Sequence, residues 1–302
     1  MSFRPSIALL LALAVLTGCA TRPPEPPPAA PPTPVALAKR PPVLGLALGG
    51  GAARGFAHVG VIQVLEEAGI KPDLVVGTSA GSLVAAIYAS GKTGAQLQQV
   101  AETMDEAAIT DWTLPLFGRG VLRGEALARY VSAQVGGKLL EDMALPLGIV
   151  ATDLHTGQGI LFRRGDTGTA VRASSAVPAV FQPVKINGQE YVDGGLVSPV
   201  PVRYARQMGA ELVLAVDISS APEGNPANDT LQVLLQTFAI MGKSINTFEL
   251  REAELVVRPA LSGIRSADFS ARRRSIEAGR AAMQAALPQL RVLLDQLRKD
   301  VR

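Results

Sequence analysis

The sequence of 302 residues contains one cysteine, two histidines and few aromatic residues (4%). One cysteine cannot form a disulfide within the chain, and two separated histidines offer no ligand cluster for a metal ion. The aromatic side chains are too few for base-stacking surfaces, and the net charge of +3 is modest. We therefore expect no metal, no other cofactor and no nucleic-acid partner. With 48% hydrophobic residues, the chain can still bury a sizeable core.

The N-terminus lacks a hydrophobic run long enough to span a bilayer. Its apolar segment, residues 7–16, follows a positively charged start and is typical of a signal peptide. The segment leads into "LTGC" (16–19), which resembles the lipobox of bacterial lipoproteins, in which the cysteine is lipidated and becomes the mature N-terminus. The resemblance implies a signal peptide over 1–18, a membrane anchor at Cys19 and, because Ala20 follows, the outer membrane of the bacterial cell envelope. An ordinary secretory signal is the alternative.

A proline-rich segment follows the cysteine. Residues 22–42 hold ten of the 22 prolines, so this segment cannot form a helix and favours extended polyproline conformations. We interpret residues 19–42 as the lipidated cysteine and a semi-rigid linker. The folded domain is then expected over 43–302, with the motifs in 43–217 and a helical part in 218–302.

From residue 43 onward, short apolar runs alternate with helical patterns. Strands are predicted at 43–48, 73–78, 146–154, 159–164 and 211–219. Helices are predicted at 56–69, 80–90, 94–104, 124–135, 199–208, 230–249 and 271–299. This alternation predicts an α/β fold with a mostly parallel central sheet covered by helices on both faces.

The segment "VVGTSAGS" (75–82) places Ser79 between Gly77 and Gly81, directly after a predicted strand. A G-x-S-x-G pattern at a strand-to-helix turn is typical of a nucleophilic serine. The same pattern also fits a small residue in a tight turn, so it remains a hypothesis until an oxyanion hole and a base are found.

A glycine-rich segment, "GGGAARG" (49–55), connects the first predicted strand to the first helix. A phosphate-binding loop would end in Gly-Lys-Ser/Thr, and a dinucleotide-binding loop would have a third glycine at Arg54. The segment fits an oxyanion hole better, because loops after neighbouring parallel strands open at the same edge, which brings Gly50 and Gly51 near Ser79. A glycine turn that merely allows close helix packing is the alternative.

Neither histidine suits a Ser-His-Asp triad. In an α/β-hydrolase the histidine follows the serine and the acid, late in the chain. No histidine follows His155, and His58 lies in the first predicted helix, where a structural role fits better.

An aspartate is the other candidate base. The segment "VKINGQEYVDGG" (184–195) predicts a hairpin, since Asn-Gly favours a two-residue type I′ turn. Its second strand carries Asp193 into the turn of Gly194 and Gly195. A carboxylate there could accept the serine proton directly, although an Asp that only closes an Asx-turn fits as well.

Together, "GGGAARG", "GTSAG" (77–81), "ASSAVPAVFQPV" (173–184) and "DGG" (193–195) resemble the patatin-like phospholipase family over about residues 43–217. The resemblance implies a three-layer α/β/α sandwich and a Ser–Asp dyad without histidine, with Ser79 as nucleophile and Asp193 as base. It assigns the oxyanion hole to Gly49, Gly50, Gly51, Ala52 and Arg54, and the motif glycines to Gly77, Gly81, Gly194 and Gly195. Arg54 departs from a strict G-x-G-x-x-G pattern.

We therefore expect a membrane-anchored serine acyl-hydrolase that acts on phospholipids or other acyl-ester lipids. A catalytically silent lipid-binding or scaffold lipoprotein is one alternative, and an acyltransferase with the same dyad is another. The stretch 111–120 collects the apolar residues Trp112, Leu114, Leu116 and Phe117. These side chains fit either a lip that meets acyl chains or ordinary core packing.

Overall fold

The structure is a computed structural model that describes residues 42–112, 119–223, 227–265 and 267–300. The expected signal peptide (1–18), the lipidation site Cys19 and all but the last residue of the linker lie outside the described residues. Leu114, Leu116 and Phe117 of the expected lip also lie outside them, whereas Trp112 is described and is 74% exposed.

The described strands form one large mixed sheet and one small sheet. The strands are β1 (Leu44–Leu48), β2 (Leu74–Thr78), β3 (Gly120–Leu122), β4 (Leu147–Asp153), β5 (Gly159–Phe162), β6 (Ala179–Phe181), β7 (Val184–Ile186), β8 (Gln189–Asp193), β9 (Leu212–Val216) and β10 (Leu255–Val257). The large sheet has the order β10-β9-β1-β2-β4-β8-β7, and β5 also pairs with β4. β10, β9, β1, β2 and β4 are parallel neighbours, whereas β8, β7 and β5 pair antiparallel. β3 and β6 form the small sheet.

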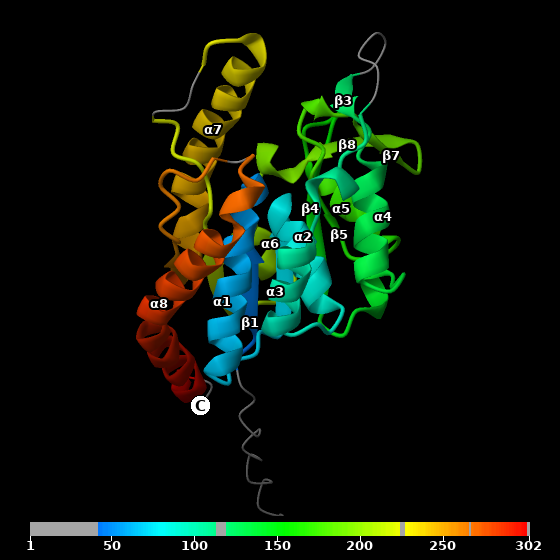
Figure 1. The fold of residues 1–302 in the computed structure, drawn as a ribbon. Helices are drawn as coiled ribbons and strands as arrows, with labels where there is room; N and C mark the ends of the chain where they lie inside the picture. Colours follow the sequence, from blue (N-terminus) through cyan, green and yellow to red (C-terminus); the bar gives the residue numbers. More distant parts are fainter. Residues whose placement is uncertain (1–41, 113–118, 224–226, 266, 301–302) are drawn as a thin grey trace, which may run out of the picture. The chain divides into compact units, whose positions relative to one another are not determined.

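Helices cover both faces of the large sheet (Figure 1). The α-helices are α1 (Phe56–Glu67), α2 (Ala80–Ala89), α3 (Gly94–Thr103), α4 (Glu125–Gln134), α5 (Thr167–Ser174), α6 (Val202–Gln207), α7 (Thr230–Glu249) and α8 (Arg272–Asp300). Short 3-10 helices are η1 (Ala52–Gly55), η2 (Glu106–Ala108), η3 (Leu140–Asp142), η4 (Gly194–Leu196), η5 (Leu250–Glu252) and η6 (Phe269–Ala271).

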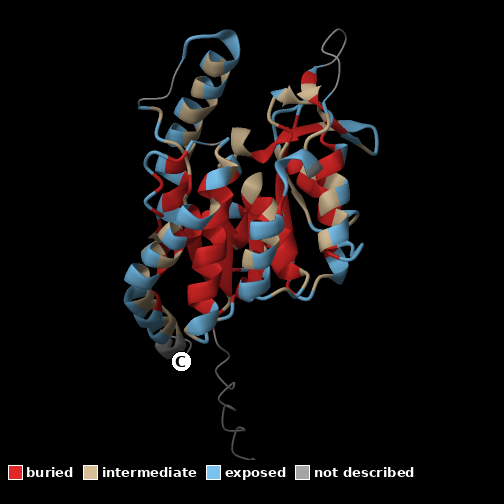
Figure 2. Cartoon of the chain, in the orientation of Figure 1, coloured by how far each residue is buried: buried red, intermediate tan, exposed pale blue. Residues whose placement is uncertain are grey.

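The alternation of side chains along the strands divides the interior into two main cores. Leu46 and Leu48 of β1 point into the larger core, which contains residues of α1, α2, α4, α5 and α8. Ala47 points to the other face, where Val202 and Ala205 of α6 pack. Because every residue of β1 is buried, the strand is apolar throughout, as in parallel sheets covered on both faces. Figure 2 shows the buried residues concentrated in the central strands and along α1 and α2.

α8 lies across α1 as a further layer on that face. A β-carbon on Gly60 would lie 2.0 Å from the carbonyl oxygen of Ile276, and one on Gly279 would lie 1.9 Å from that of Ala57. The two helix backbones therefore touch, and α1 is buried over its first ten residues. None of the described helices combines the length and the apolar character needed to cross a bilayer.

The predicted α/β fold with a three-layer arrangement is confirmed, and its sheet is mixed. The antiparallel part consists of β5, which pairs with β4, and of the hairpin of β7 and β8. The turn residues of this hairpin, Asn187 and Gly188, both have positive φ, as a type I′ turn requires. The helix predicted at 199–208 begins only at Val202, after Pro201. Helix α5 and the three-residue strands β3, β6 and β10 were not predicted.

Candidate active site

Ser79 occupies the sharp connection between β2 and α2. Its backbone has φ 53° and ψ −123°, a conformation that residues other than glycine rarely adopt. The carbonyl group of Ser79 accepts a hydrogen bond from the N–H of Ser82, so helix α2 begins directly at the serine. The prediction that Ser79 lies between this strand and this helix is therefore confirmed, and the strained backbone leaves its side chain half-exposed at the sheet edge.

The elbow has room only for glycine on either side. A β-carbon on Gly81 would lie 2.1 Å from the carbonyl oxygen of Leu48, and one on Gly77 would lie 2.4 Å from that of Gly81. The motif glycines thus allow α2 to begin against the end of β1, which brings the glycine-rich loop beside Ser79. The glycines after Asp193 differ from each other. A β-carbon on Gly194 would lie 2.2 Å from the carbonyl oxygen of Val150, whereas one on Gly195 would approach only the Asp193 carboxylate.

Ser174, at the end of α5, holds the elbow in place. The backbone N–H of Ser79 donates to Ser174 Oγ at 2.9 Å, and that hydroxyl donates to the carbonyl oxygen of Val150 at 2.5 Å. Ser174 is fully buried. The sequence identified this serine only as part of the segment 173–184, and its contact with Ser79 could not be deduced from spacing.

The pairing of β4 brings Asp193 next to Ser79. On β4, β5 occupies one edge from Ile149 to Thr152, so β2 and β8 share the opposite edge, one after the other. β2 ends with Thr78 opposite Val150, and β8 ends with Asp193 opposite Ala151, the next residue. The two strands therefore end facing each other.

The carboxylate of Asp193 is buried, with only one oxygen firmly bonded. Oδ1 accepts the N–H of Gly195 at 2.7 Å, so the Asx-turn considered for this residue does form. Oδ2 has no well-formed hydrogen bond among the described residues, although the Ser79 side chain is close enough to lower the pKa of Asp193. Burial outweighs both donors and raises this pKa to about 6. The carboxylate thus combines a fixed orientation with one oxygen free to take a proton.

The glycine-rich loop runs directly past Ser79. A β-carbon on Gly50 would lie 3.1 Å from Ser79 Cβ, and Gly55 approaches Ala80 in the same way. However, the N–H of Gly50 donates to the carbonyl oxygen of Pro199 at 2.9 Å, so the expectation that this amide points into the site is wrong.

The same correction applies to the amides of Gly49 and Arg54. Gly49 donates to Val216 and Arg54 donates to Gly51, which fixes the loop in place but removes both groups as free donors. The N–H groups of Gly51 and Ala52 donate to no group in the part of the chain that the structure describes. Of the predicted oxyanion-hole residues, only Gly51 and Ala52 retain free amides.

His58, in helix α1, hydrogen-bonds to the glycine-rich loop. Its Nε2 lies 2.8 Å from the carbonyl oxygen of Gly49, and the ring is fully buried. Burial lowers the pKa of His58 to about 4, so the ring is neutral at physiological pH and Nε2 donates the hydrogen bond. His58 therefore has the structural role that the sequence favoured.

The second histidine and the buried arginine differ in their surroundings. His155 is exposed on the turn between β4 and β5, where its backbone N–H donates to Asp153. Arg54 is buried in η1, and burial lowers the pKa of its guanidinium to about 10, an effect partly opposed by Asp217. Arg54 therefore stays charged at neutral pH.

Within the described ranges, no group of three or more His, Cys, Asp or Glu side chains gathers as metal ligands would.

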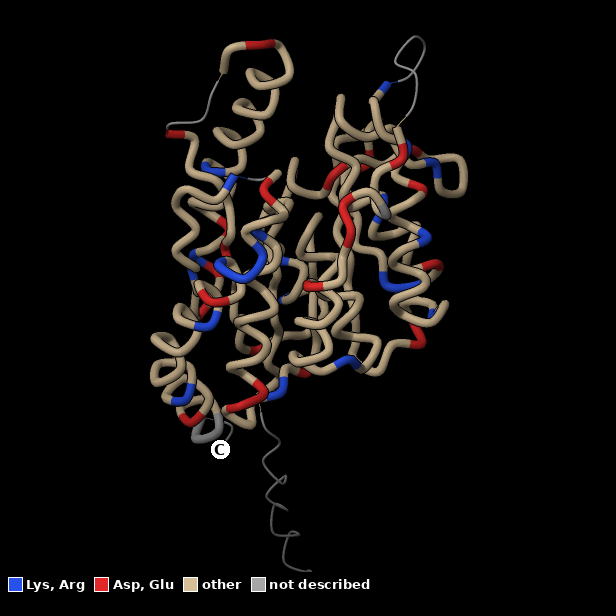
Figure 3. The backbone as a smooth tube through the Cα atoms, viewed as in Figure 1, with Lys and Arg blue, Asp and Glu red and all other residues tan. Residues whose placement is uncertain are grey.

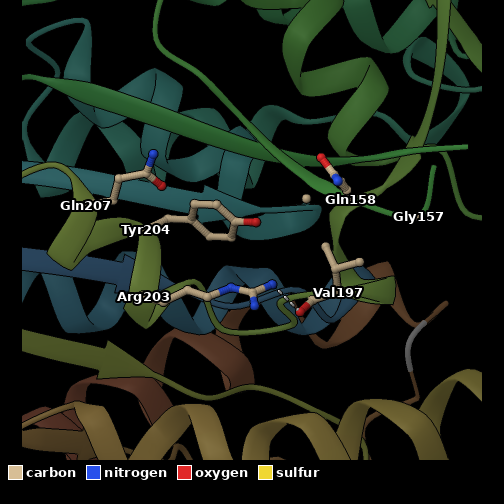
Figure 4. A pocket seen from close by; sticks show the side chains of 7 residues that line it. Gly157, Gln158, Val197, Arg203, Tyr204 and Gln207 are labelled. Carbon is tan, nitrogen blue, oxygen red and sulfur yellow. Dashed lines mark hydrogen bonds between the residues drawn. The ribbon is translucent and has the colours of Figure 1, made fainter.

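Two surface cavities in the described part of the chain lie apart from Ser79 and Asp193. The first, of about 580 Å³, is lined by Gly157, Gln158, Gly159, Val197, Arg203, Tyr204 and Gln207 (Figure 4). In it, Arg203 donates to the carbonyl oxygen of Val197. The second, of about 650 Å³, lies between η3, β5 and Met208. Neither cavity is lined by Ser79 or Asp193.

Comparison with known proteins gives one family. A family model described as patatin-like phospholipase matches residues 46–206. An uncharacterized NTE family protein of Mycobacterium tuberculosis is 36% identical over 202 residues, which cover 66% of this chain and 56% of that protein. Patatin-like phospholipase domain-containing protein 6 of Mus musculus is 34% identical over 188 residues, covering 60% of this chain and 14% of the mouse protein.

A solved structure with a similar fold comes from another bacterium. VipD from Legionella pneumophila superposes with a TM-score of 0.56 at 14% identity, over 83% of this chain and 68% of VipD. The chain spans about half the length of the mycobacterial relative that it matches.

Proposed function

The chain belongs to the patatin-like phospholipase family, and we propose that it is a serine acyl-hydrolase of lipid esters with Ser79 as nucleophile and Asp193 as base. The observation that carries the proposal is the meeting of β2 and β8 on one edge of β4, because it brings a strained serine and a buried carboxylate together. A scaffold protein would have no need of the backbone strain at Ser79.

The first half of the reaction forms an acyl-enzyme. Asp193 Oδ2 takes the hydroxyl proton of Ser79 while Oγ bonds to the ester carbonyl carbon, and the carbonyl electron pair moves onto its oxygen. The N–H groups of Gly51 and Ala52, with the N-terminus of α2, stabilise this oxyanion. The bond to the alcohol then breaks, and the leaving alcohol takes the proton from Asp193.

The second half releases the fatty acid. Asp193 accepts a proton from water as the water oxygen bonds to the acyl carbon, and a second oxyanion forms at the same donors. When the bond to Ser79 breaks, its oxygen recovers the proton from Asp193. An acyltransferase would use the same steps with an alcohol in place of water.

The test is a panel of substrates. Full-length protein in detergent is incubated with a phospholipid, a lysophospholipid and a neutral ester, with Ser79→Ala as control. The proposal predicts free fatty acid from at least one substrate and none with the variant. Fatty acid transferred to an added alcohol without hydrolysis would assign the acyltransferase, and no turnover of any substrate would contradict the proposal.

We further propose that Cys19 is lipidated and anchors the enzyme in the bacterial envelope, through a linker that ends near residue 42. The ten-residue apolar run before "LTGC" supports this. Mass spectrometry of the mature N-terminus should find acyl chains on Cys19, and Cys19→Ser should leave the protein unprocessed or outside the membrane fraction. A mature N-terminus without lipid, in a protein that stays membrane-bound, would contradict the anchor.

A further inference from the structure

The N-terminal part of α7 is a largely apolar stretch of helix in which no residue is buried. No charged residue occurs between Thr230 and Gly242. The apolar side chains of this part are exposed or only half-buried: Leu231, Val233, Leu234, Leu235, Phe238, Ala239, Ile240 and Met241. Figure 2 shows no buried residue here, and Figure 3 shows the same length of helix without Lys, Arg, Asp or Glu.

The C-terminal part of α7 is attached to the loops of the candidate active site. Glu249 accepts the hydroxyl of Ser198 at 2.5 Å, five residues after Asp193. Asn246 donates to Ser219 Oγ at 2.9 Å, and Ser219 follows Ile218, the residue that packs against Gly51. The uncharged part of α7 then extends beyond the carboxyl ends of the parallel strands, the edge that carries Ser79 (Figure 1).

The distribution of the exposed side chains indicates what covers them. At about 3.6 residues per turn, Val233 and Ile240 face away from Leu231 and Leu235. A single flat protein surface cannot cover opposite sides of one helix, whereas a fluid apolar phase surrounds it. The thirteen residues from Thr230 to Gly242 measure about 20 Å, less than the hydrocarbon core of about 30 Å, so they can enter a bilayer but are too short to cross it.

We propose that residues 230–242 of α7 insert into a lipid surface and hold the Ser79 edge of the sheet against it. The insertion is independent of the proposed function; only the statement that it presents a lipid ester to Ser79 depends on that function. The contacts of Glu249 and Asn246 link the inserted helix to the loops of Asp193 and Gly51. This contact is separate from the anchor at Cys19.

A fluorophore placed on α7 tests the insertion without any need for turnover. Full-length chains with Cys19→Ala and one new cysteine, Ile240→Cys or Lys71→Cys, are labelled with NBD and mixed with phosphatidylethanolamine/phosphatidylglycerol vesicles that carry brominated acyl chains. Lys71 is exposed just before β2, at the opposite end of the sheet from Ser79. Quenching should be at least about five times stronger at position 240. Equal quenching at both positions, or none at 240, would overturn the proposal.

Two matched substitutions test the consequence for activity. Val233 is 51% exposed on α7 and Val292 is 54% exposed on α8, towards the other end of the domain. Val233→Asp should slow hydrolysis of vesicle lipid about ten-fold and leave hydrolysis of a soluble short-chain ester within about two-fold, because a charge is unfavourable in hydrocarbon. Val292→Asp should change neither rate.

Equal losses in the two variants would overturn the proposal. A wild-type dimer that Val233→Asp converts to a monomer would also overturn it, by assigning the surface to a second copy of the chain. If no substrate is turned over at all, the proposed function fails, and the quenching experiment still decides on insertion.

Discussion

The backbone N–H of Ser79 donates to the buried hydroxyl of Ser174 at 2.9 Å. Because Ser174 also donates to Val150 on β4, the strained elbow is tied to the same strand that positions Asp193. The nucleophile and the base are thus both held by one strand, β4, rather than by two independent loops. Ser174 does not touch the reacting atoms and acts as a positioning residue.

Replacing Ser174 tests this link. Ser174→Ala leaves the N–H of Ser79 and the carbonyl group of Val150 unpaired, each at about 1–3 kcal/mol. We expect kcat on a soluble ester to fall about ten- to a hundred-fold with KM changed less than about three-fold, because the serine moves while substrate contacts persist. Ser174→Cys should recover part of the loss. An unchanged kcat in Ser174→Ala would show that Ser79 keeps its position without the hydrogen bond to Ser174.

The pH dependence of the reaction should follow Asp193. Burial raises the pKa of this carboxyl to about 6, and a general base must be deprotonated to act. We expect kcat/KM on a soluble ester to be constant above about pH 7 and to fall about ten-fold per pH unit below about pH 6. A profile that is flat down to pH 4.5 would contradict a raised pKa at the base.

An inflection near pH 6 resembles that of a histidine, so the two histidines are the necessary controls. His155 is exposed on the turn after β4, and buried His58 is neutral down to about pH 4. His155→Ala and His58→Gln should both keep the inflection, with His58→Gln losing about 1–3 kcal/mol of stability through its bond to Gly49. Loss of the inflection in a folded His155→Ala protein would restore the histidine triad.

The same carboxyl should reduce the stability of the fold at neutral pH. Its pKa rises from 3.8 to about 6 on folding, so its contribution to the free energy of unfolding is full below about pH 4 and is lost as pH rises through about 6. The difference amounts to about 3 kcal/mol. Urea unfolding should find Asp193→Asn more stable than wild type at pH 7.5, by up to this amount, and not at pH 4.5. An equal difference at both pH values would contradict burial as the cause.

Local signals in the sequence predicted much of the site. The elbow at Ser79 and the turn at Asn187 and Gly188 depend on residues next to each other in the chain, and both were correctly predicted. Three contacts between distant segments were not predicted. The antiparallel continuation of β2 by β8, the hydrogen bond from Ser79 to Ser174 and the use of the Gly50 amide by Pro199 each join residues about 95 or more positions apart.

In the C-terminal part of the chain, too, a local feature was predicted and a tertiary one was not. The helix predicted at 230–249 has these bounds in the structure, because Asp229 caps its first turn through Gln232. The exposure of its apolar side chains could not be predicted from the sequence. Their exposure depends on where the chain places α7, and tertiary structure alone determines that.

The most direct test of the account is covalent labelling of the nucleophile. Full-length protein is treated with a fluorophosphonate probe, and the labelled peptide is identified by tandem mass spectrometry in wild type and in Asp193→Asn. The account predicts one adduct, on Ser79, formed at least about a hundred-fold more slowly in the variant, because the serine then lacks its base. An adduct on another serine, or equal labelling rates in the two proteins, would contradict it.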